Sequence, residues 1–257
     1  MGTIAITGSA SGIGKATRER LEREGHTVIG IDLHDAEVIA DLTTAEGRSA
    51  MVDGVTRACG GTLDGLLAGA GLSGRTNESG RVVRLNYFGA VATLHGLRPL
   101  LAHAGKASAV AISSNAATTQ PGGADPHAVQ LCLDGDEEAV VDLVTREPAG
   151  AYAVAKLALA RWVRRHATTD DWVGSDIRLN AIAPGIIVTP MTQAGLDSIL
   201  AMPEWPRPTK EPGKADEVAG LIRYLLSDEA RYFVGSFIVM DGGTDAALRA
   251  DDWPAAR

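Results

Sequence analysis

Features that define several other classes of protein are scarce in this 257-residue chain. Its two cysteines, Cys59 and Cys132, are too few for a disulfide framework or a thiolate metal site. No apolar run approaches the ~20 residues of a bilayer-spanning helix, and the segment after Met1 lacks a signal-peptide pattern. Aromatic residues make up only 4%, so Ala, Val, Leu and Ile must form most of the core. We therefore expect a soluble, cytoplasmic protein with no metal site and no membrane partner.

Positive charge is also scarce. Lys and Arg number 24 against 32 Asp and Glu, for a formal net charge of −8, and no basic cluster with interleaved aromatics occurs. Nucleic-acid binding needs a basic surface that offsets the phosphates. The sequence therefore predicts no nucleic-acid partner.

The first motif is a glycine-rich turn between a strand and a helix. A β-branched run, Thr3 to Thr7, leads into Gly8-Ser9-Ala10-Ser11-Gly12-Ile13-Gly14, and amphipathic spacing follows in Lys15 to Glu24. Glycines let the backbone approach a diphosphate, whose charge is stabilised by the N–H groups and dipole of the helix N-terminus. The arrangement favours a dinucleotide site over a plain tight turn. Its predicted contacts are Gly8, Ser11, Gly12, Ile13 and Gly14.

Asp32 ends the next predicted strand, His26 to Ile31. An acidic residue about 20 residues beyond the glycines is placed to hydrogen-bond the adenosine ribose and to repel a 2′-phosphate. Leu33 follows, where an arginine would hold such a phosphate. The pattern predicts NAD rather than NADP, unless Asp32 merely caps a turn.

Other predicted strands also end in residues suited to a site. Open α/β sheets bind ligands at the carboxyl ends of their strands. Such positions hold Asp41-Leu42 after Glu37 to Ala40, Gly69-Ala70-Gly71 after Leu63 to Ala68, and Ser113-Ser114 after Ala107 to Ile112. A serine pair after a strand is also ordinary helix-capping chemistry.

A long predicted helix, Gly80 to Ala102, carries Asn86 on an otherwise apolar side. A buried amide is costly unless it is satisfied. Asn86 therefore either bridges backbone groups or holds water in a site.

Tyr152 and Lys156 lie four residues apart in the apolar-rich run Ala149 to Val163. If that run is helical, the two side chains share one face. A neighbouring cation favours the phenolate, so Lys156 would make Tyr152 a usable base near neutral pH. This spacing also arises by chance, so its meaning depends on the other motifs.

Strands alternate with helices along the whole chain, without an internal repeat or a low-complexity linker. Later elements are the strand Arg178 to Ile182, the helix Ala215 to Leu226 and the strand Phe237 to Met240. We predict a single domain over residues 1–257: an α/β, Rossmann-type, doubly wound parallel sheet of about seven strands with helices on both faces.

Two segments depart from this alternation. Residues 120–150 contain the acidic run Asp134 to Glu138, which predicts one or two helices outside the sheet, acting as a lid, a subunit contact or a solvated excursion. Residues 191–213 are rich in proline and are predicted to form a mobile flap over a pocket. Trp205 in that flap either contacts substrate or anchors the loop. The prolines and Gly185 in the preceding segment, Pro184 to Pro190, predict a loop of defined conformation.

Together, Thr7-Gly8-x-x-x-Gly12-x-Gly14, Asn86, Ser114 and Tyr152-x-x-x-Lys156 resemble the short-chain dehydrogenase/reductase family over nearly the whole chain. Arg178-Leu179-Asn180 and Pro184-Gly185 resemble its later signatures. Ala68-Gly69-Ala70-Gly71 departs from it, because many members carry Asn before Ala-Gly. Within the family, Gly30 to Arg48 and Asn86 to Ala90 resemble bacterial hydroxysteroid dehydrogenases/carbonyl reductases, which also carry a helical insertion before the tyrosine helix.

The resemblance implies an NAD-dependent oxidoreductase that interconverts a secondary alcohol and a ketone, with a hydroxysteroid as first candidate. The alternatives are another apolar alcohol, such as an aryl or phenylpropanoid alcohol, and a non-catalytic dinucleotide sensor or scaffold. It also implies a homodimer or homotetramer.

The same resemblance implies roles for individual residues. Tyr152 exchanges the proton of the substrate, Ser114 binds the substrate oxygen, Lys156 holds the nicotinamide ribose, and Asn86 holds a water that links Lys156 to solvent. The remaining implied cofactor contacts are Leu33, Asp41, Leu42, Gly69, Ala70, Gly71, Pro184, Gly185, Ile187 and Thr189.

Overall fold

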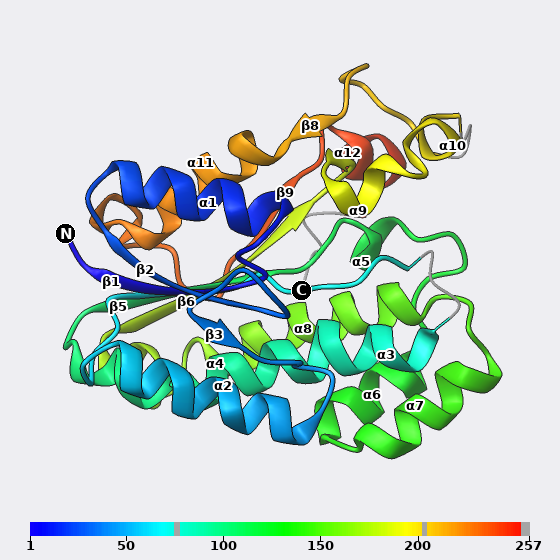
Figure 1. Ribbon diagram of the computed structural model, residues 1–257. Helices are drawn as coiled ribbons and strands as arrows, with labels where there is room; N and C mark the ends of the chain where they lie inside the picture. The colour runs from blue at the N-terminus through cyan, green and yellow to red at the C-terminus, as the bar shows by residue number, and fades with distance from the viewer. Residues whose placement is uncertain (75–77, 202–204, 253–257) are drawn as a thin grey trace.

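The computed structural model describes residues 1–74, 78–201 and 205–252 (Figure 1). At its centre lies a seven-stranded sheet in the order β3-β2-β1-β4-β5-β6-β9, in which every neighbouring pair is parallel. The strands are β1 (Thr3–Thr7), β2 (Thr27–Asp32), β3 (Val38–Ile39), β4 (Gly65–Ala68), β5 (Ala107–Ile112), β6 (Ile177–Pro184) and β9 (Phe237–Met240). The strand order reverses between β1 and β4, so loops on the two sides of that point diverge and leave room for a ligand.

Helices cover both faces of the sheet (Figure 1). On one face, α1 (Gly12–Arg23) packs against α11 (Ala215–Leu226); on the other lie α2 (Ala45–Ala58), α4 (Ala90–His103) and α8 (Ala151–His166). Ile4 and Ile6 of β1 belong to the core under α1 and α11, and Ala5 belongs to the core on the opposite face. Because both faces of the sheet are buried, the sequences of its strands are nearly continuous apolar runs.

The predicted helix Gly80 to Ala102 is interrupted by a π-helical turn. It consists of α3 (Ser79–Val83), the π-helical turn Arg84–Gly89, and α4. Such turns occur often at functional sites, and this one contains the buried Asn86.

The segment 120–150 forms two helices outside the sheet, α6 (Pro126–Asp134) and α7 (Glu137–Arg146), after a short α5 (Ala116–Thr119). Helix α6 packs on α8, and α7 packs on α3 (Figure 1). The side chain of Asp136 accepts a hydrogen bond from the Ala139 N–H and caps α7. The predicted helical insertion is therefore confirmed.

The Arg178-Leu179-Asn180 motif joins β6 to the end of α11. The Arg178 guanidinium donates hydrogen bonds to the carbonyl oxygens of Leu225 (3.0 Å), Ser227 (2.8 Å) and Ala230 (2.9 Å). Asn180 donates to the Phe233 carbonyl oxygen (2.8 Å) and accepts from the Ser236 N–H (3.0 Å). This motif satisfies backbone groups away from the strand ends, so its role is structural.

The segment after β6 is more regular than its proline content predicts. It contains β7 (Ile187–Val188) paired with β8 (Gly213–Lys214), α9 (Pro190–Gln193) and α10 (Leu196–Leu200), and residues 202–204 of the predicted flap lie outside the described residues. Proline at the first position of α9 is compatible with a helix because its missing N–H has no intrahelical partner there. The remaining short elements are the 3-10 helices Val173–Ser175 and Asp228–Ala230, and α12 (Thr244–Leu248).

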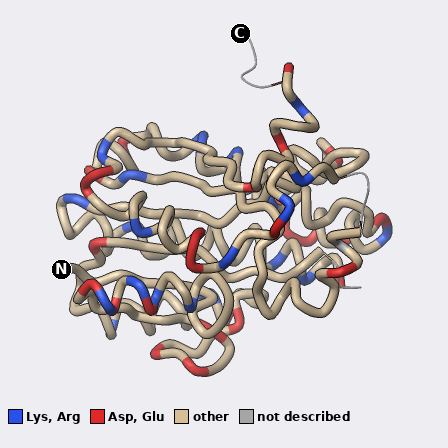
Figure 2. The backbone as a smooth tube through the Cα atoms, turned by 90° about the horizontal axis from the view of Figure 1, so that it is seen from above, with Lys and Arg blue, Asp and Glu red and all other residues tan. Residues whose placement is uncertain are grey.

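Charged residues of both signs are intermingled along the outer segments (Figure 2). Over the described residues, no helix combines the length and the apolar character that crossing a membrane requires.

Candidate active site

A cavity of about 260 Å³ opens at the carboxyl ends of the strands, beside the point where their order reverses. Its wall contains every residue that the sequence predicts as a cofactor contact. These are Gly8, Ser11, Gly12, Ile13, Gly14, Asp32, Leu33, Asp41, Leu42, Gly69, Ala70, Gly71, Tyr152, Lys156, Pro184, Gly185, Ile187 and Thr189. Ser114 lines it too.

Backbone groups at the start of α1 form one end of the cavity. Gly8 and Gly12 have positive φ angles of 75° and 54°, which favour glycine, and a Cβ on Gly14 would overlap the Gly8 carbonyl oxygen. Ser11 at the N-cap makes no side-chain cap, and the first turn of α1 has no acidic residue. The free N–H donors and the positive end of the helix dipole therefore fit a diphosphate.

The Asp32 carboxylate is fixed between this turn and the end of β2. Its Oδ2 accepts a hydrogen bond from the Ala10 N–H (2.9 Å), and its Oδ1 accepts one from the Leu33 N–H (2.7 Å). Each oxygen keeps a further lone pair, so the carboxylate can also accept from ribose hydroxyls.

Asp41, Leu42 and Thr43 form the next part of the wall. The Asp41 Oδ1 accepts from the Thr43 hydroxyl (2.7 Å) and from the Thr43 N–H (2.9 Å). The hydroxyl bond is the largest influence on this carboxyl group and, together with the other hydrogen bonds and nearby arginines, holds the pKa of Asp41 below its usual value. Asp41 is therefore ionised at neutral pH.

Helix α8 carries Tyr152 and Lys156 to the cavity and is fixed to the end of β5. The Lys156 ammonium donates to the Ile112 carbonyl oxygen (2.7 Å), and the Ser113 hydroxyl donates to the Lys156 carbonyl oxygen (2.8 Å). Ser114, the next residue, is hydrogen-bonded through its side chain to Tyr152. The Lys156 Nζ lies 5.7 Å from the centroid of the Tyr152 ring. The three polar heads thus share one end of the cavity.

Burial controls the ionisation of both groups on α8. It raises the pKa of Tyr152 above its ordinary value, although the hydrogen bond with Ser114 acts in the opposite direction. It lowers the pKa of Lys156 to about 8. The expectation that Lys156 depresses the pKa of Tyr152 is therefore wrong for this structure, because desolvation of the phenolate outweighs the other influences and the ammonium bonds Ile112.

Asn86 adopts the first of the two roles that the sequence leaves open, since its amide bridges backbone groups. Its Oδ1 accepts from the Leu72 N–H (2.8 Å), and its Nδ2 donates to the Leu72 carbonyl oxygen (2.9 Å). A Cβ on Gly71 would lie 3.0 Å from the Asn86 Oδ1 and 3.7 Å from the Lys156 Nζ. Asn86 therefore holds the wall segment beside Lys156, and the water expected at Asn86 stays a prediction.

Several wall residues were not predicted from the sequence. Most of them lie next to predicted contacts, whereas Arg81 belongs to α3 and Leu85 to the π-helical turn. They are Ile31, Ala40, Thr43, Leu72, Arg81, Leu85, Ile112, Ser113, Pro190, Met191 and Thr192. Gly74 was not predicted either; it is not part of the wall, but a Cβ there would lie 2.7 Å from the Tyr152 Cβ, so a side chain would displace the tyrosine. For Ile31, Ala40, Ile112 and Ser113 the available signal was a position at a strand end, whereas Arg81 and Leu85 lie in helical segments and had no such signal.

The insertion and Trp205 do not reach this site. Among the described residues, none from 120–150 lines the cavity, and Trp205 does not line it either. The lid interpretation of the insertion and the substrate contact predicted for Trp205 therefore find no support, whereas Pro190 to Thr192 at the edge of the flap do line the cavity.

Known proteins resemble this chain in sequence and fold. A family model described as short chain dehydrogenase matches residues 2–125, and one described as Enoyl-(Acyl carrier protein) reductase matches residues 139–245. The chain is 41% identical to the 3-alpha-hydroxysteroid dehydrogenase/carbonyl reductase of Comamonas testosteroni, over 97% of this chain and 98% of that protein. The chain belongs to the short-chain dehydrogenase/reductase family.

Two further relatives extend the comparison. The coniferyl-alcohol dehydrogenase of Pseudomonas sp. (strain HR199 / DSM 7063) is 31% identical, over 93% of this chain and 95% of that protein. The solved 3-alpha-hydroxysteroid dehydrogenase from Pseudomonas sp. B-0831, complexed with NADH, superposes with a TM-score of 0.90 at 42% identity, covering 98% of this chain and 100% of that one. The predicted family, the Rossmann-type fold and the oxidoreductase class are thus confirmed.

The lowered pKa of Lys156 predicts a pH-dependent stability. The unfolded chain keeps this lysine protonated up to about pH 10.4, whereas the folded chain releases the proton near pH 8. Between those values the unfolded state binds more protons, so stability rises with pH. Relative to Lys156→Met, the free energy of unfolding of the unmodified chain should rise by about 2 kcal/mol from pH 8 to pH 10.

Urea denaturation at a series of pH values measures this difference. Lys210→Met removes an exposed lysine and serves as the control, whose pH dependence should parallel that of the unmodified chain. Parallel curves for Lys156→Met and the unmodified chain would contradict a buried lysine of lowered pKa.

Proposed function

We propose that this short-chain dehydrogenase/reductase uses NAD to interconvert a secondary alcohol and its ketone, and that its substrates are hydroxysteroids. The observation that carries the proposal is the shared cavity, which brings Ser114, Tyr152 and Lys156 together with the glycine turn and Asp32. This set combines a dinucleotide cradle with a proton donor and an oxygen-binding hydroxyl, as carbonyl chemistry requires.

The cofactor would lie along the strand ends. The start of α1 would hold its diphosphate, Asp32 its adenosine ribose, and Asp41 and Leu42 would flank the adenine. Lys156 would bind the nicotinamide ribose, and Ile187 and Thr189 the carboxamide. When bound, the nicotinamide supplies or accepts the hydride.

Ser114 and Tyr152 would act on the substrate oxygen. The Ser114 hydroxyl would donate a hydrogen bond to that oxygen and stabilise the negative charge that develops there. The Tyr152 hydroxyl would give its proton to the oxygen during reduction and take it back during oxidation. Its raised pKa keeps the phenol neutral, which is the form that carbonyl reduction needs. Oxidation needs the phenolate, which the hydrogen bond with Ser114 would favour.

An uncharged, apolar substrate fits the remaining wall. Leu72, Pro190 and Met191 line the cavity, and the basic residues on the described wall are Lys156, assigned above to the ribose, and Arg81. Arg81 acts electrostatically on Asp41, so it belongs to the adenine end. Two relatives named as 3-alpha-hydroxysteroid dehydrogenases, at 41% and 42% identity, support a steroid. The coniferyl-alcohol relative at 31% identity keeps aryl alcohols as the second candidate.

Residues 1–257 would act as one domain that assembles into a homodimer or homotetramer in the cytoplasm. Support for the assembly comes from the family resemblance, and support for the location comes from the two cysteines, both of which are free.

Replacing Tyr152 with Phe tests the proposed chemistry. Phe keeps the ring but removes the proton, so turnover should fall by several orders of magnitude while the affinity for NADH stays within about threefold. Steady-state rates with a hydroxysteroid and fluorescence titration with NADH measure the two effects. Tyr87→Phe removes a hydroxyl from a buried tyrosine outside the cavity and should leave turnover unchanged. Near-normal turnover in Tyr152→Phe would refute the assignment.

Replacing Asp32 with Asn tests the proposed cofactor choice. Without the negative charge, the repulsion of a 2′-phosphate is lost. The ratio of kcat/KM for NAD to kcat/KM for NADP should therefore fall by about tenfold. The control is Asp35→Asn, which makes the same charge change at an exposed side chain three residues away. It should leave the ratio unchanged. An unchanged ratio in Asp32→Asn would show that another residue selects the cofactor.

A further inference from the structure

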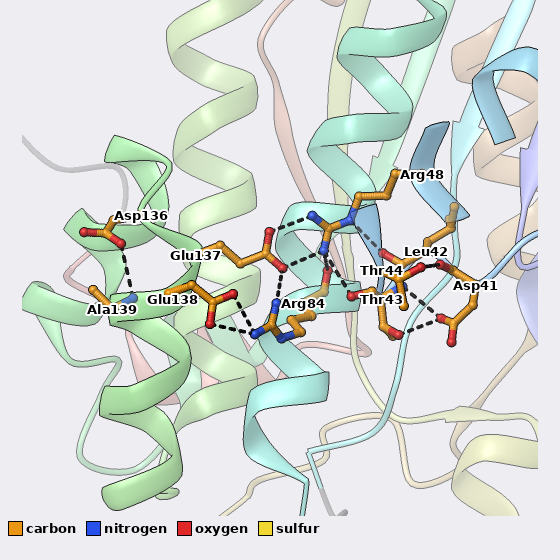
Figure 3. Close-up of polar contacts among 10 residues, drawn as sticks. All are labelled: Asp41, Leu42, Thr43, Thr44, Arg48, Arg84, Asp136, Glu137, Glu138 and Ala139. Atoms are coloured by element: carbon orange, nitrogen blue, oxygen red, sulfur yellow. Dashed lines mark hydrogen bonds and ion pairs between the residues drawn. The ribbon is translucent and has the colours of Figure 1, made fainter. Parts of the chain in front are cut away.

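An ion-pair network joins the helical insertion to the wall of the cavity (Figure 3). Glu137 is the first residue of α7, and its carboxylate accepts two hydrogen bonds from Arg48 of α2, at 2.6 Å from Nη1 and 2.8 Å from Nη2. The side chain of Arg48 is only 13% exposed, and that of Glu137 is only 21% exposed. Bidentate, largely buried pairs of this kind are more specific than exposed surface pairs.

The other edge of the Arg48 guanidinium holds the backbone of the cavity wall. Its Nε donates to the Leu42 carbonyl oxygen (2.8 Å), and its Nη2 donates to that of Thr43 (3.4 Å). The guanidinium also lies over the Phe88 ring, 5.8 Å from its centroid. Arg48 is therefore clamped between the insertion and the Leu42–Thr43 segment.

This wall segment has few other restraints on its carbonyl groups. Asp41 holds the N–H and hydroxyl of Thr43, and the Thr44 N–H returns to the Asp41 carbonyl oxygen (3.2 Å). Among the described residues, the hydrogen bonds to the Leu42 and Thr43 carbonyl oxygens come from Arg48. The orientation of these two peptide groups thus depends on where the guanidinium is held.

Glu137 is the ionic partner that holds the guanidinium there, beside a longer hydrogen bond from the Arg48 Nη2 to the Arg84 carbonyl oxygen (3.3 Å). Burial alone would raise the pKa of this carboxyl group, but hydrogen bonds and charge interactions with Arg48 and Arg84 outweigh it and hold the pKa below its usual value. Arg84 contributes a further bond, from Nη1 to the Glu137 Oε1 (2.8 Å). Removing the carboxylate would leave two neighbouring cations without their shared partner, one of them largely buried. Arg48 would then turn toward water and release the wall.

We propose that Glu137 is a positioning residue for the adenine end of the cofactor site, acting through Arg48 on the Leu42–Thr43 wall. The inference rests on the proposed function, which places the adenine beside Asp41 and Leu42. It gives the insertion a role distinct from a lid: α7 braces the dinucleotide site from outside without touching the ligand.

Glu137→Gln tests this role, and Glu138→Gln is the matched control. Glu138 is the adjacent residue, forms its ion pair with Arg84, and has a side chain that is 78% exposed. Glu137→Gln should raise the Kd for NADH and the KM for NAD by about tenfold, equivalent to about 1.4 kcal/mol, while kcat changes by less than about twofold. Glu138→Gln should match the unmodified chain in every constant.

Inhibition by cofactor fragments separates positioning from general damage. AMP and ADP-ribose contain the adenine, so their inhibition constants should rise with Glu137→Gln by the factor seen for NADH. Nicotinamide mononucleotide lacks the adenine, so its inhibition constant should not change. A variant with general structural damage would bind all three fragments more weakly and would also have a lower kcat.

Arg48→Lys provides a second variant that keeps the positive charge. An ammonium cannot reproduce the planar fork that spans Glu137 and both carbonyl groups, so the same adenine-specific loss is expected. The inference is overturned if either variant is folded, as judged by circular dichroism, and binds NADH and AMP as tightly as the unmodified chain. Failure of the unmodified chain to bind NADH would instead overturn the proposed function.

Discussion

The site depends on the close approach of the backbone at the ends of β1 and β4, where the strand order reverses. The Thr7 hydroxyl accepts hydrogen bonds from the N–H groups of Gly69 (3.0 Å) and Ala70 (3.2 Å), which ties the two strand ends together. A Cβ on Gly8 would lie 2.9 Å from the Ala70 Cα, so glycine is required for this contact. The start of α1 is thereby brought to the cavity, and its free N–H groups become a binding surface for an anion.

Burial determines the ionisation of Lys156 and Tyr152 at the opposite end of the cavity. Lys156 is only 4% exposed, and it is held by a strand-end carbonyl group instead of by a carboxylate. A carboxylate partner would stabilise its charge and raise its pKa, whereas the carbonyl group leaves the effect of burial dominant. The same burial keeps Tyr152 protonated next to Ser114. The site therefore contains a neutral proton donor, Tyr152, next to Lys156, whose basicity is lowered by burial.

Much of this arrangement could be predicted from local sequence. The bounds of β1, β5, α11 and β9 agree with the predicted ranges, because apolar runs and periodicity are local properties. The cofactor contacts at strand ends were also predictable, since parallel strands bring their carboxyl ends to one edge of the sheet.

Other features depend on contacts between distant residues and have no local signal. Arg48 and Glu137 are 89 positions apart, so no spacing rule reveals their pairing. The π-helical turn at Asn86 looks like ordinary helix in the sequence. The direction of the Tyr152 pKa was mispredicted because helical spacing shows the neighbouring cation but not the depth of burial.

The central claim is that a dinucleotide cradle and a tyrosine proton donor share one cavity for the oxidation and reduction of an apolar secondary alcohol. The most direct measurement is NADH formation from a panel of hydroxysteroids and aryl alcohols, with NADP in place of NAD as the control. The account predicts turnover of a 3α-hydroxysteroid with NAD and much weaker turnover with NADP. A chain that binds NADH but oxidises no alcohol in the panel would contradict it.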